Sequence, residues 1–249
     1  MQNKPNITAF ILAAGLGSRL KPWTDSHPKA LVTVNGKSLL QRNVQYLQSY
    51  GITNIVINVH HFAQQITDAI QLNNGWGSNI SISDETNEVL ETGGGFIHAA
   101  PLFQNSETIL ILNCDILTNL NLTQLISAHL DNLSIATLAV TNRQSNRALL
   151  FNKNHELVGW HNTTTSEEKL PAIHKLEPNE TPQPFAFSGI HALSNAIFNA
   201  NTLSGKFSMI DLYLNLCASQ KIIAYNHAND TVLDVGKPEA IAVAEGLFT

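Results

Sequence analysis

Cysteine and long apolar runs are both scarce in this chain. Its 249 residues include only Cys114 and Cys217, which form no Cys-x-x-Cys or Cys/His spacing, so a disulfide scaffold is excluded and a cytoplasmic location is predicted. The apolar run at residues 7–13 is too short to cross a membrane, and no cleavage-like pattern accompanies it. We therefore expect neither a membrane segment nor an export signal.

Charged residues are also few, at 13% of the chain, and the formal net charge is -5. Such a chain has no basic face for nucleic acid, so an anionic substrate has to be met by a few local cations and a metal ion. The hydrophobic fraction of 43% is enough for the core of one large domain. We expect a single domain over residues 1–249, and the sequence gives no indication of an oligomer.

The spacing of apolar residues predicts the fold class. Short β-branched runs alternate with amphipathic stretches, a pattern typical of α/β proteins. The predicted strands are residues 7–12, 54–59, 80–83, 108–112, 135–140, 185–193 and 222–225. The predicted helices are residues 38–50, 62–72, 96–102, 123–131, 211–219 and 238–246. The expected fold is a three-layer α/β/α sandwich around a mostly parallel, Rossmann-like sheet.

One segment, residues 147–184, departs from this alternation. Two short apolar runs, 149–151 and 157–160, flank the turn-like residues 152–154, and the chain then becomes polar and proline-containing. We expect a β-hairpin followed by a mobile loop, which is either a functional lid or a plain surface excursion.

A glycine-rich loop follows the first predicted strand. Residues 12–24 read L-A-A-G-L-G-S-R-L-K-P-W-T, and Lys29 comes shortly after. Glycines let backbone N–H groups approach an anion, and Arg19 and Lys29 add positive charge. Pro22 would break a helix that began at Gly17, so the spacing fits neither a P-loop nor a dinucleotide fingerprint. We predict an irregular phosphate-binding loop, with a plain glycine turn as the alternative.

This loop resembles the signature of the sugar-1-phosphate nucleotidylyltransferases, L-A-A-G-x-G-[ST]-R-L-x-P-x-T followed by P-K. The resemblance implies transfer of a nucleoside monophosphate from an NTP to a sugar 1-phosphate, with release of pyrophosphate. It implies that Arg19 neutralises the β- and γ-phosphates and that Lys29 neutralises the α-phosphate. The loop residues that it implies as nucleotide contacts are Leu12, Ala13, Ala14, Gly15, Gly17 and Ser18.

Two aspartates at apolar runs are candidate metal ligands. Asp115 follows the predicted strand 108–112, and Asp234 lies in the run V-L-D-V-G. A carboxylate beyond the end of a strand projects into the ligand crevice, where Mg²⁺ would balance it, although a lone aspartate there is more often a cap or turn former. In the resembled family both positions bind Mg²⁺, which implies a catalytic Asp115 and a metal site at Asp115 and Asp234. Asn113 is implied as a nucleotide contact, and Cys114 stands where the family often has glycine.

A glycine triplet, residues 93–95, precedes the predicted helix 96–102. It lets the backbone lie flat against a ligand, or it is a flexible turn. The surrounding E-T-G-G-G resembles short N-acetylmuramic acid 1-phosphate uridylyltransferases and mannose-type guanylyltransferases. The contacts implied by that resemblance are Glu85, Glu91 and Gly93 for the nucleotide, and Thr92 and Gly94 for the sugar substrate.

The run F-S-G-I at residues 187–190 resembles a strand that borders the sugar pocket of the same subfamily. The resemblance implies that Ser188 and Gly189 contact the sugar and that the 147–184 segment lies over its pocket. Small residues in a strand are equally consistent with close packing.

The resemblance also divides the chain into a nucleotide-binding part, about 1–115, and a sugar-binding part, about 116–249, with no C-terminal β-helix expected. Two alternatives stay open: a cytidylyltransferase acting on a non-sugar phosphate, and a non-catalytic sensor that binds a nucleotide sugar. Base choice is open as well, because uracil and guanine both fit the pattern.

Overall fold

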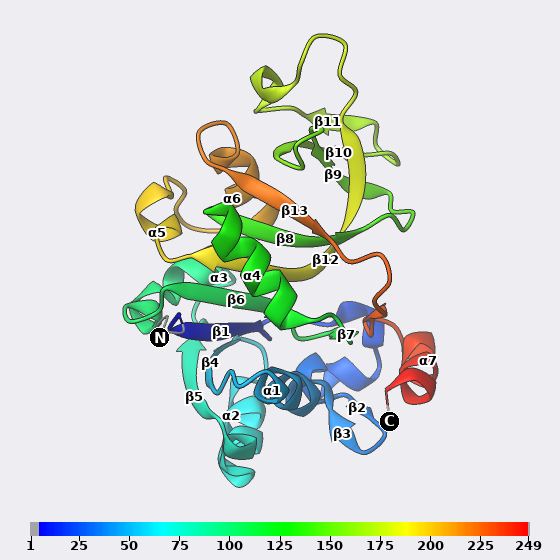
Figure 1. Ribbon diagram of the computed structural model, residues 1–249. Helices are drawn as coiled ribbons and strands as arrows, with labels where there is room; N and C mark the ends of the chain where they lie inside the picture. The colour runs from blue at the N-terminus through cyan, green and yellow to red at the C-terminus, as the bar shows by residue number, and fades with distance from the viewer. Residues whose placement is uncertain (1–4, 249) are drawn as a thin grey trace.

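The computed structural model describes residues 5–248, so the ends of the predicted domain, residues 1–4 and 249, lie outside the described residues. A ten-stranded mixed sheet forms its centre (Figure 1). Its main strands are β1 Ile7–Leu12, β4 Asn54–Val59, β5 Asn79–Asp84, β6 Thr108–Asn113, β8 Ala136–Thr141, β12 Gln183–Ser194 and β13 Ile222–Asn226. The excursion contributes β9 Arg147–Phe151, β10 Leu157–Asn162 and β11 Glu167–Lys169.

The sheet is mostly parallel, as predicted. β5, β4, β1 and β6 run parallel to one another, and β13 runs parallel to β8. β12 is antiparallel to both β6 and β8, and it joins the two halves of the chain in one sheet. Two small sheets stand apart: β2 Thr33–Val34 with β3 Lys37–Ser38, and β7 Ile116–Thr118 with β14 Val232–Asp234.

Seven α-helices complete the fold: α1 Leu39–Ser49, α2 Ala63–Leu72, α3 Glu91–His98, α4 Leu122–Asn132, α5 Ile197–Ala200, α6 Met209–Leu216 and α7 Pro238–Leu247, counted over the described part of the chain. Polar residues begin several of them. The side chain of Ser38 caps α1 and that of Asn121 caps α4, while Ser208 and Asp211 form a capping box at α6. None of these helices has both the length and the hydropathy needed to cross a bilayer.

Side chains of successive strand residues point to opposite faces and build two cores. On β1, Ala9 and Ile11 belong to a core shared with α1, α2 and α4, whereas Phe10 belongs to a core shared with α3 and α6. Helices therefore cover both faces of the sheet, and the predicted three-layer α/β/α sandwich is confirmed.

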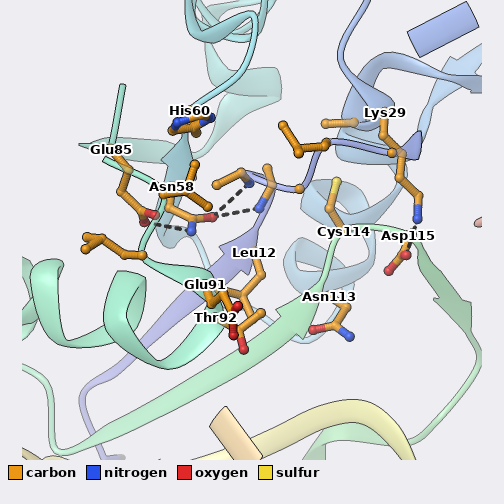
Figure 2. Close-up of a pocket in the computed structure, with 18 of the residues that line it drawn as sticks. Leu12, Lys29, Asn58, His60, Glu85, Glu91, Thr92, Asn113, Cys114 and Asp115 are labelled. Atoms are coloured by element: carbon orange, nitrogen blue, oxygen red, sulfur yellow. Dashed lines mark hydrogen bonds and ion pairs between the residues drawn. The ribbon is translucent and has the colours of Figure 1, made fainter. Parts of the chain in front are cut away.

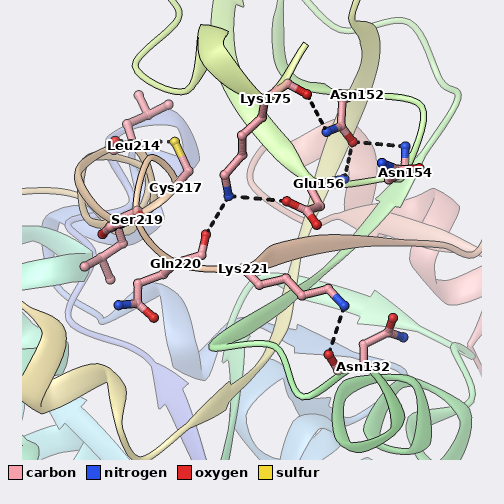
Figure 3. A network of polar contacts seen from close by, with 11 residues as sticks. Asn132, Asn152, Asn154, Glu156, Lys175, Leu214, Cys217, Ser219, Gln220 and Lys221 are labelled. Atoms are coloured by element: carbon pink, nitrogen blue, oxygen red, sulfur yellow. Dashed lines mark hydrogen bonds and ion pairs between the residues drawn. The ribbon is translucent and has the colours of Figure 1, made fainter. Parts of the chain in front are cut away.

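The 147–184 excursion contains the predicted hairpin as β9 and β10, and β11 adds a third strand. A polar network ties it to the rest of the protein (Figure 3). The Nζ of Lys175 lies 3.3 Å from the Oε2 of Glu156 and donates to the carbonyl of Gln220, which follows α6, at 3.0 Å. The Lys175–Glu156 ion pair therefore lies within the segment, and the hydrogen bond from Lys175 to Gln220 joins the segment to the rest of the protein, a contact that the polar sequence did not predict.

The glycine triplet lies inside α3, although the predicted helix starts after it at residue 96. Glycine is a poor helix former, so residues 93–95 read as a loop from propensity alone. Close tertiary contacts override that propensity, because a Cβ on Gly95 would lie 2.4 Å from the Oε1 of Glu85. After α3, the predicted helical region continues as a short 3₁₀ turn at Ala100–Phe103.

Candidate active site

A cavity of about 580 Å³ lies where the carboxyl ends of β1, β4, β5 and β6 meet. Figure 2 shows side chains from several of these strand ends directed into it. Ligands of open α/β sheets bind at this edge, because the loops that follow parallel strands converge there. The predicted site residues that line the cavity are Leu12, Ala13, Ala14, Gly15, Gly17, Ser18, Arg19, Lys29, Glu85, Glu91, Thr92, Asn113 and Asp115.

The loop at residues 13–19, which we call the anion loop, has the irregular form that the sequence predicts. Gly17 has φ +64°, and a Cβ there would lie 2.9 Å from the side chains of both Lys29 and Thr24. Thr24 Oγ1 donates to the carbonyl of Gly17 at 2.9 Å. Gly17 is therefore required for the turn and for the close approach of Lys29.

The start of the anion loop is held by Asn58 at the end of β4. Its Oδ1 accepts from the backbone N–H groups of Ala13, at 2.7 Å, and Ala14, at 3.3 Å. Within residues 5–248, no acceptor takes the backbone N–H groups of residues 15–19. Successive free amides of this kind form a concave donor set for an anion.

Opposite charges meet beside this loop. The ammonium of Lys29 forms an ion pair with the Asp115 carboxylate, and both side chains are largely shielded from solvent, with exposures of 15% and 21%. Arg19 Nη2 lies 3.5 Å from Asp234 Oδ2, and that pair is about half exposed. The cations predicted to meet phosphates are thus paired with the two predicted metal ligands.

Pairing of β7 with β14 brings Asp115 and Asp234 close together. Asp234 lies opposite Ile116, and the N–H of Val235 donates to the carbonyl of Asp115 at 2.8 Å. Asp234 does not line the main cavity, however. It lies in an adjoining hollow that it shares with Arg19 and Lys237. Arg19 borders both spaces and connects them.

Glu85 and Cys114 are buried at the cavity wall. Asn58 Nδ2 donates to Glu85 Oε1 at 2.8 Å, and burial raises the pKa of this carboxyl. Burial also raises the pKa of the Cys114 thiol, which therefore stays neutral near pH 7. Asn43 Nδ2 donates to the Cys114 carbonyl at 2.9 Å and fixes the backbone next to Asp115.

Gly93 and Gly94, which the sequence predicts as ligand contacts, pack against the 205–208 segment. Their N–H groups both donate to the carbonyl of Phe207, at 2.9 Å and 3.0 Å. A Cβ on Gly93 would lie 2.6 Å from the Phe207 ring, and one on Gly94 would lie 2.3 Å from the Gly205 carbonyl. Neither glycine lines the cavity. Glycine is needed here because the 205–208 segment crosses the helix so closely.

Ser188 and Gly189, the predicted sugar contacts of the F-S-G-I run, do not line this cavity. Ser188 is 1% exposed, and its Oγ lies 2.8 Å from Nε2 of His227. Gly189 has φ +73°, and a Cβ there would lie 2.7 Å from the Asn113 Nδ2. These residues support the wall from behind, since Gly189 gives Asn113 its space.

Sequence reasoning missed several residues of the cavity wall, namely Leu16, Ala30, Asn58, His60, Val89, Leu90, Cys114 and Ser208. Asn58 left a usable signal, because a polar residue interrupts the apolar β4 one position before its end. His60 Nδ1 is buried without a hydrogen-bond partner among the described residues. Ser208 gave no signal, because it reaches the wall only through the packing of α6 on α3.

Comparison with known proteins agrees with this arrangement. N-acetylmuramate alpha-1-phosphate uridylyltransferase of Caulobacter vibrioides is 29% identical over 98% of both chains. The protein of the same name from Neisseria meningitidis serogroup B is 42% identical over 46% of this chain and 49% of its own length. A crystal structure of HddC from Yersinia pseudotuberculosis complexed with GMP-PN has the same fold, with a TM-score of 0.76 at 24% identity over 97% of this chain and 99% of that one.

The Nucleotidyl transferase family matches residues 8–154, which is more than half of the chain. The matched region includes β1, the anion loop, β4, β5 and β6, and therefore nearly the whole cavity wall. This protein belongs to the nucleotidyl transferase family.

Proposed function

We propose that this protein transfers a nucleoside monophosphate from an NTP to a sugar 1-phosphate and releases pyrophosphate. The observation that carries the proposal is the convergence of unpaired loop amides, Lys29 and Asp115 in one cavity. Amides and cations suit a triphosphate, and the carboxylate suits a divalent cation. The relative that aligns along almost the whole chain is named as a uridylyltransferase for a sugar 1-phosphate, which supports this substrate class.

The reaction we propose is a single in-line displacement at the α-phosphorus by a phosphate oxygen of the sugar 1-phosphate. The new P–O bond forms as the bond to pyrophosphate breaks, and no protein nucleophile is needed because the incoming phosphate is already ionised. Lys29 neutralises the α-phosphate and Arg19 the β- and γ-phosphates. The anion loop amides donate to phosphate oxygens and fix the triphosphate for attack.

Asp115 and Asp234 fit a divalent cation, which we propose is Mg²⁺. Asp115 directly precedes β7 and Asp234 lies on its partner strand β14, and no cluster of three or more His, Cys, Asp or Glu residues surrounds them in residues 5–248. Mg²⁺ needs no more than this, since it usually takes one or two protein carboxylates together with phosphates and water. When bound, it would offset the negative charge that gathers between the two phosphates.

We place the NTP in the cavity and the sugar towards the C-terminal part of the chain. Nearly all cavity residues lie within 1–115, and Ser208 is the exception among the described residues. This distribution supports the proposed division into a nucleotide-binding part, about 1–115, and a sugar-binding part, about 116–249. Both cysteines are buried free thiols, which supports a reducing compartment such as the cytoplasm.

The proposal is tested by pyrophosphate release from each of the four NTPs paired with a panel of sugar 1-phosphates. UTP with N-acetylmuramate α-1-phosphate is the first pair to measure, and GTP with mannose 1-phosphate is the second. Turnover with a sugar 1-phosphate is expected. Turnover only with CTP and phosphocholine would instead identify a cytidylyltransferase, and nucleotide-sugar binding without turnover would identify a sensor.

A further inference from the structure

We propose that Asn58 and Glu85 are a positioning pair that holds the anion loop in the conformation that receives phosphates. The inference rests on the proposed function, because it assigns residues that act on the phosphate site through the loop. Asn58 lies near the end of β4 and Glu85 directly follows β5, and Figure 2 shows them linked to each other and to the loop.

Asn58 extends the pairing of β1 with β4 beyond the end of the ladder. The last registered pair is Leu12 with Asn58, and the Asn58 side chain then accepts from the next two amides, those of Ala13 and Ala14. These two amides turn towards β4, whereas the amides that follow them have no acceptor among residues 5–248. Asn58 therefore marks the boundary in the loop: the amides up to Ala14 are hydrogen-bonded to β4, and those that follow are available to a ligand.

The role requires one orientation of the Asn58 amide, and Glu85 enforces it. The Oδ1 has to face the two loop N–H groups, so the Nδ2 faces Glu85, to whose Oε1 it donates at 2.8 Å. A flipped amide would direct its N–H groups at two donors and its oxygen at a carboxylate, so both partners favour the same orientation. Asn58 is 2% exposed, and water therefore has little access to replace either contact.

Besides its hydrogen bond from Asn58, Glu85 is held by two further contacts. Its N–H donates to the Val59 carbonyl at 2.8 Å, and its carboxylate lies against Gly95 of α3, where any Cβ would come within 2.4 Å of Oε1. The residue is 4% exposed. Burying a carboxylate costs desolvation free energy unless it has hydrogen-bond partners, which indicates that Glu85 is needed here as an acceptor for Asn58. The chain of contacts runs from α3 through Glu85 and Asn58 to the anion loop.

Inorganic pyrophosphate distinguishes this role from a direct contact of Glu85 with the base, because pyrophosphate has no base. Its dissociation constant and that of the NTP that turns over are measured by calorimetry for the wild type, Asn58→Leu, Glu85→Met, the double variant and Glu85→Gln. We expect Asn58→Leu and Glu85→Met to weaken both ligands by the same factor, on the order of tenfold. The double variant should be no weaker than Asn58→Leu, because the two residues act in series.

Glu85→Gln is the conservative rescue, since its amide oxygen still accepts from Asn58, and it should bind pyrophosphate like the wild type. Asn54→Leu is the matched control: Asn54 begins the same strand, is exposed, and contacts Asn79 at 3.3 Å rather than the loop. Hydrogen exchange of the Ala13 and Ala14 amides supplies a readout that needs no ligand. It should be faster in Glu85→Met than in Glu85→Gln, even if Asn58→Leu does not fold.

Weaker NTP binding with unchanged pyrophosphate binding in Glu85→Met would overturn the proposal and make Glu85 a base contact. Unchanged exchange at Ala13 and Ala14 in Glu85→Met would overturn it as well. If the wild type turns over and the variants bind pyrophosphate and the NTP as tightly as the wild type, the positioning role is wrong but the proposed function stands. If the wild type neither binds pyrophosphate nor turns over, the proposed function is wrong. The exchange rates of the Ala13 and Ala14 amides still test whether Asn58 and Glu85 hold the loop.

Discussion

The charged cluster at the cavity and a polar trio behind it both contain an aspartate in contact with a basic side chain, but they differ in how far their groups are accessible to a ligand. In the cavity cluster, Lys29 pairs with Asp115 and Arg19 with Asp234, next to loop amides that lack an internal acceptor. Each of these pairs contains a cation that a phosphate can take over and a carboxylate that a metal ion can take over. The cluster therefore holds its charges ready for exchange with a ligand.

The trio consists of Ser188, His227 and Asp230. Ser188 Oγ lies 2.8 Å from His227 Nε2, and His227 Nδ1 lies 3.5 Å from Asp230 Oδ2. This order of groups is that of a hydrolytic triad, yet Ser188 is 1% and His227 4% exposed, so no substrate reaches the hydroxyl. A binding site therefore differs from a structural network in its accessibility and in having donors without an internal acceptor, and residue type alone does not distinguish the two.

Among changes to the charged cluster at the cavity, removing the Lys29 ammonium should have the largest effect on turnover. Lys29→Met is expected to lower kcat by about 10² to 10⁴, because the transition-state charge on the α-phosphate loses its partner. Steady-state pyrophosphate release measures the change. Lys21→Met is the control, since Lys21 forms an ion pair with Asp25 on the exposed surface, away from the cavity. Wild-type turnover in Lys29→Met would mean that the Lys29–Asp115 pair is structural, like the trio.

Acidification should affect the buried networks of the C-terminal half next. Burial lowers the pKa of His129 to about 4 and that of His191 to about 3. The unfolded chain takes up these protons below pH 6.5 and the folded chain does not, so stability is complete above pH 6.5 and falls towards pH 3 to 4.

The expected loss between pH 6.5 and pH 5 is about 2 kcal/mol for each of these two histidines. Urea unfolding at the two pH values measures it. In His129→Gln the loss should shrink by about 2 kcal/mol. An unfolding free energy that is the same at both pH values would contradict the buried, neutral state of these rings.

Breaking the trio should cost stability without weakening substrate binding. Ser188→Ala leaves His227 Nε2 without its partner, and the expected cost is about 1–3 kcal/mol in the free energy of unfolding. Urea unfolding and the KM for the sugar 1-phosphate are measured together. A raised KM at unchanged stability would restore Ser188 to the predicted role of substrate contact.

Asp234→Asn should have the smallest effect, because the Arg19–Asp234 pair is about half exposed. We expect about a tenfold rise in the divalent cation concentration that gives half-maximal rate, with kcat recovered at saturation. A Mg²⁺ titration of initial rates measures it, with Asp68→Asn as a control on the surface of α2. An unchanged titration would leave Asp115 as the sole metal ligand among the two.

Local patterns predicted most of the sheet and the anion loop. The β-branched run of β4 and the apolar run of β6 are strands in the structure within one residue of their predicted bounds, because alternation and strand length are properties of neighbouring residues. The predicted helix start at residue 96 was wrong, because α3 begins at Glu91. The hydrogen bonds that join Gly93 to the Phe207 carbonyl and Ser188 to the His227 ring left no local pattern, because their partners are distant in the sequence.

The sequence by itself predicted the main strands and helices in their order, the irregular loop after β1 and the family, since each depends on residues adjacent in the chain. It did not predict the short elements β2, β3, β7, β11 and α5. Only the tertiary structure decided that Asp234 lies beside Asp115 but outside the cavity, and that Asn58 and Glu85 stand behind the anion loop. The physical reason is that burial and hydrogen-bond partners are fixed by segments that meet only when the sheet has formed, and no local pattern records those meetings.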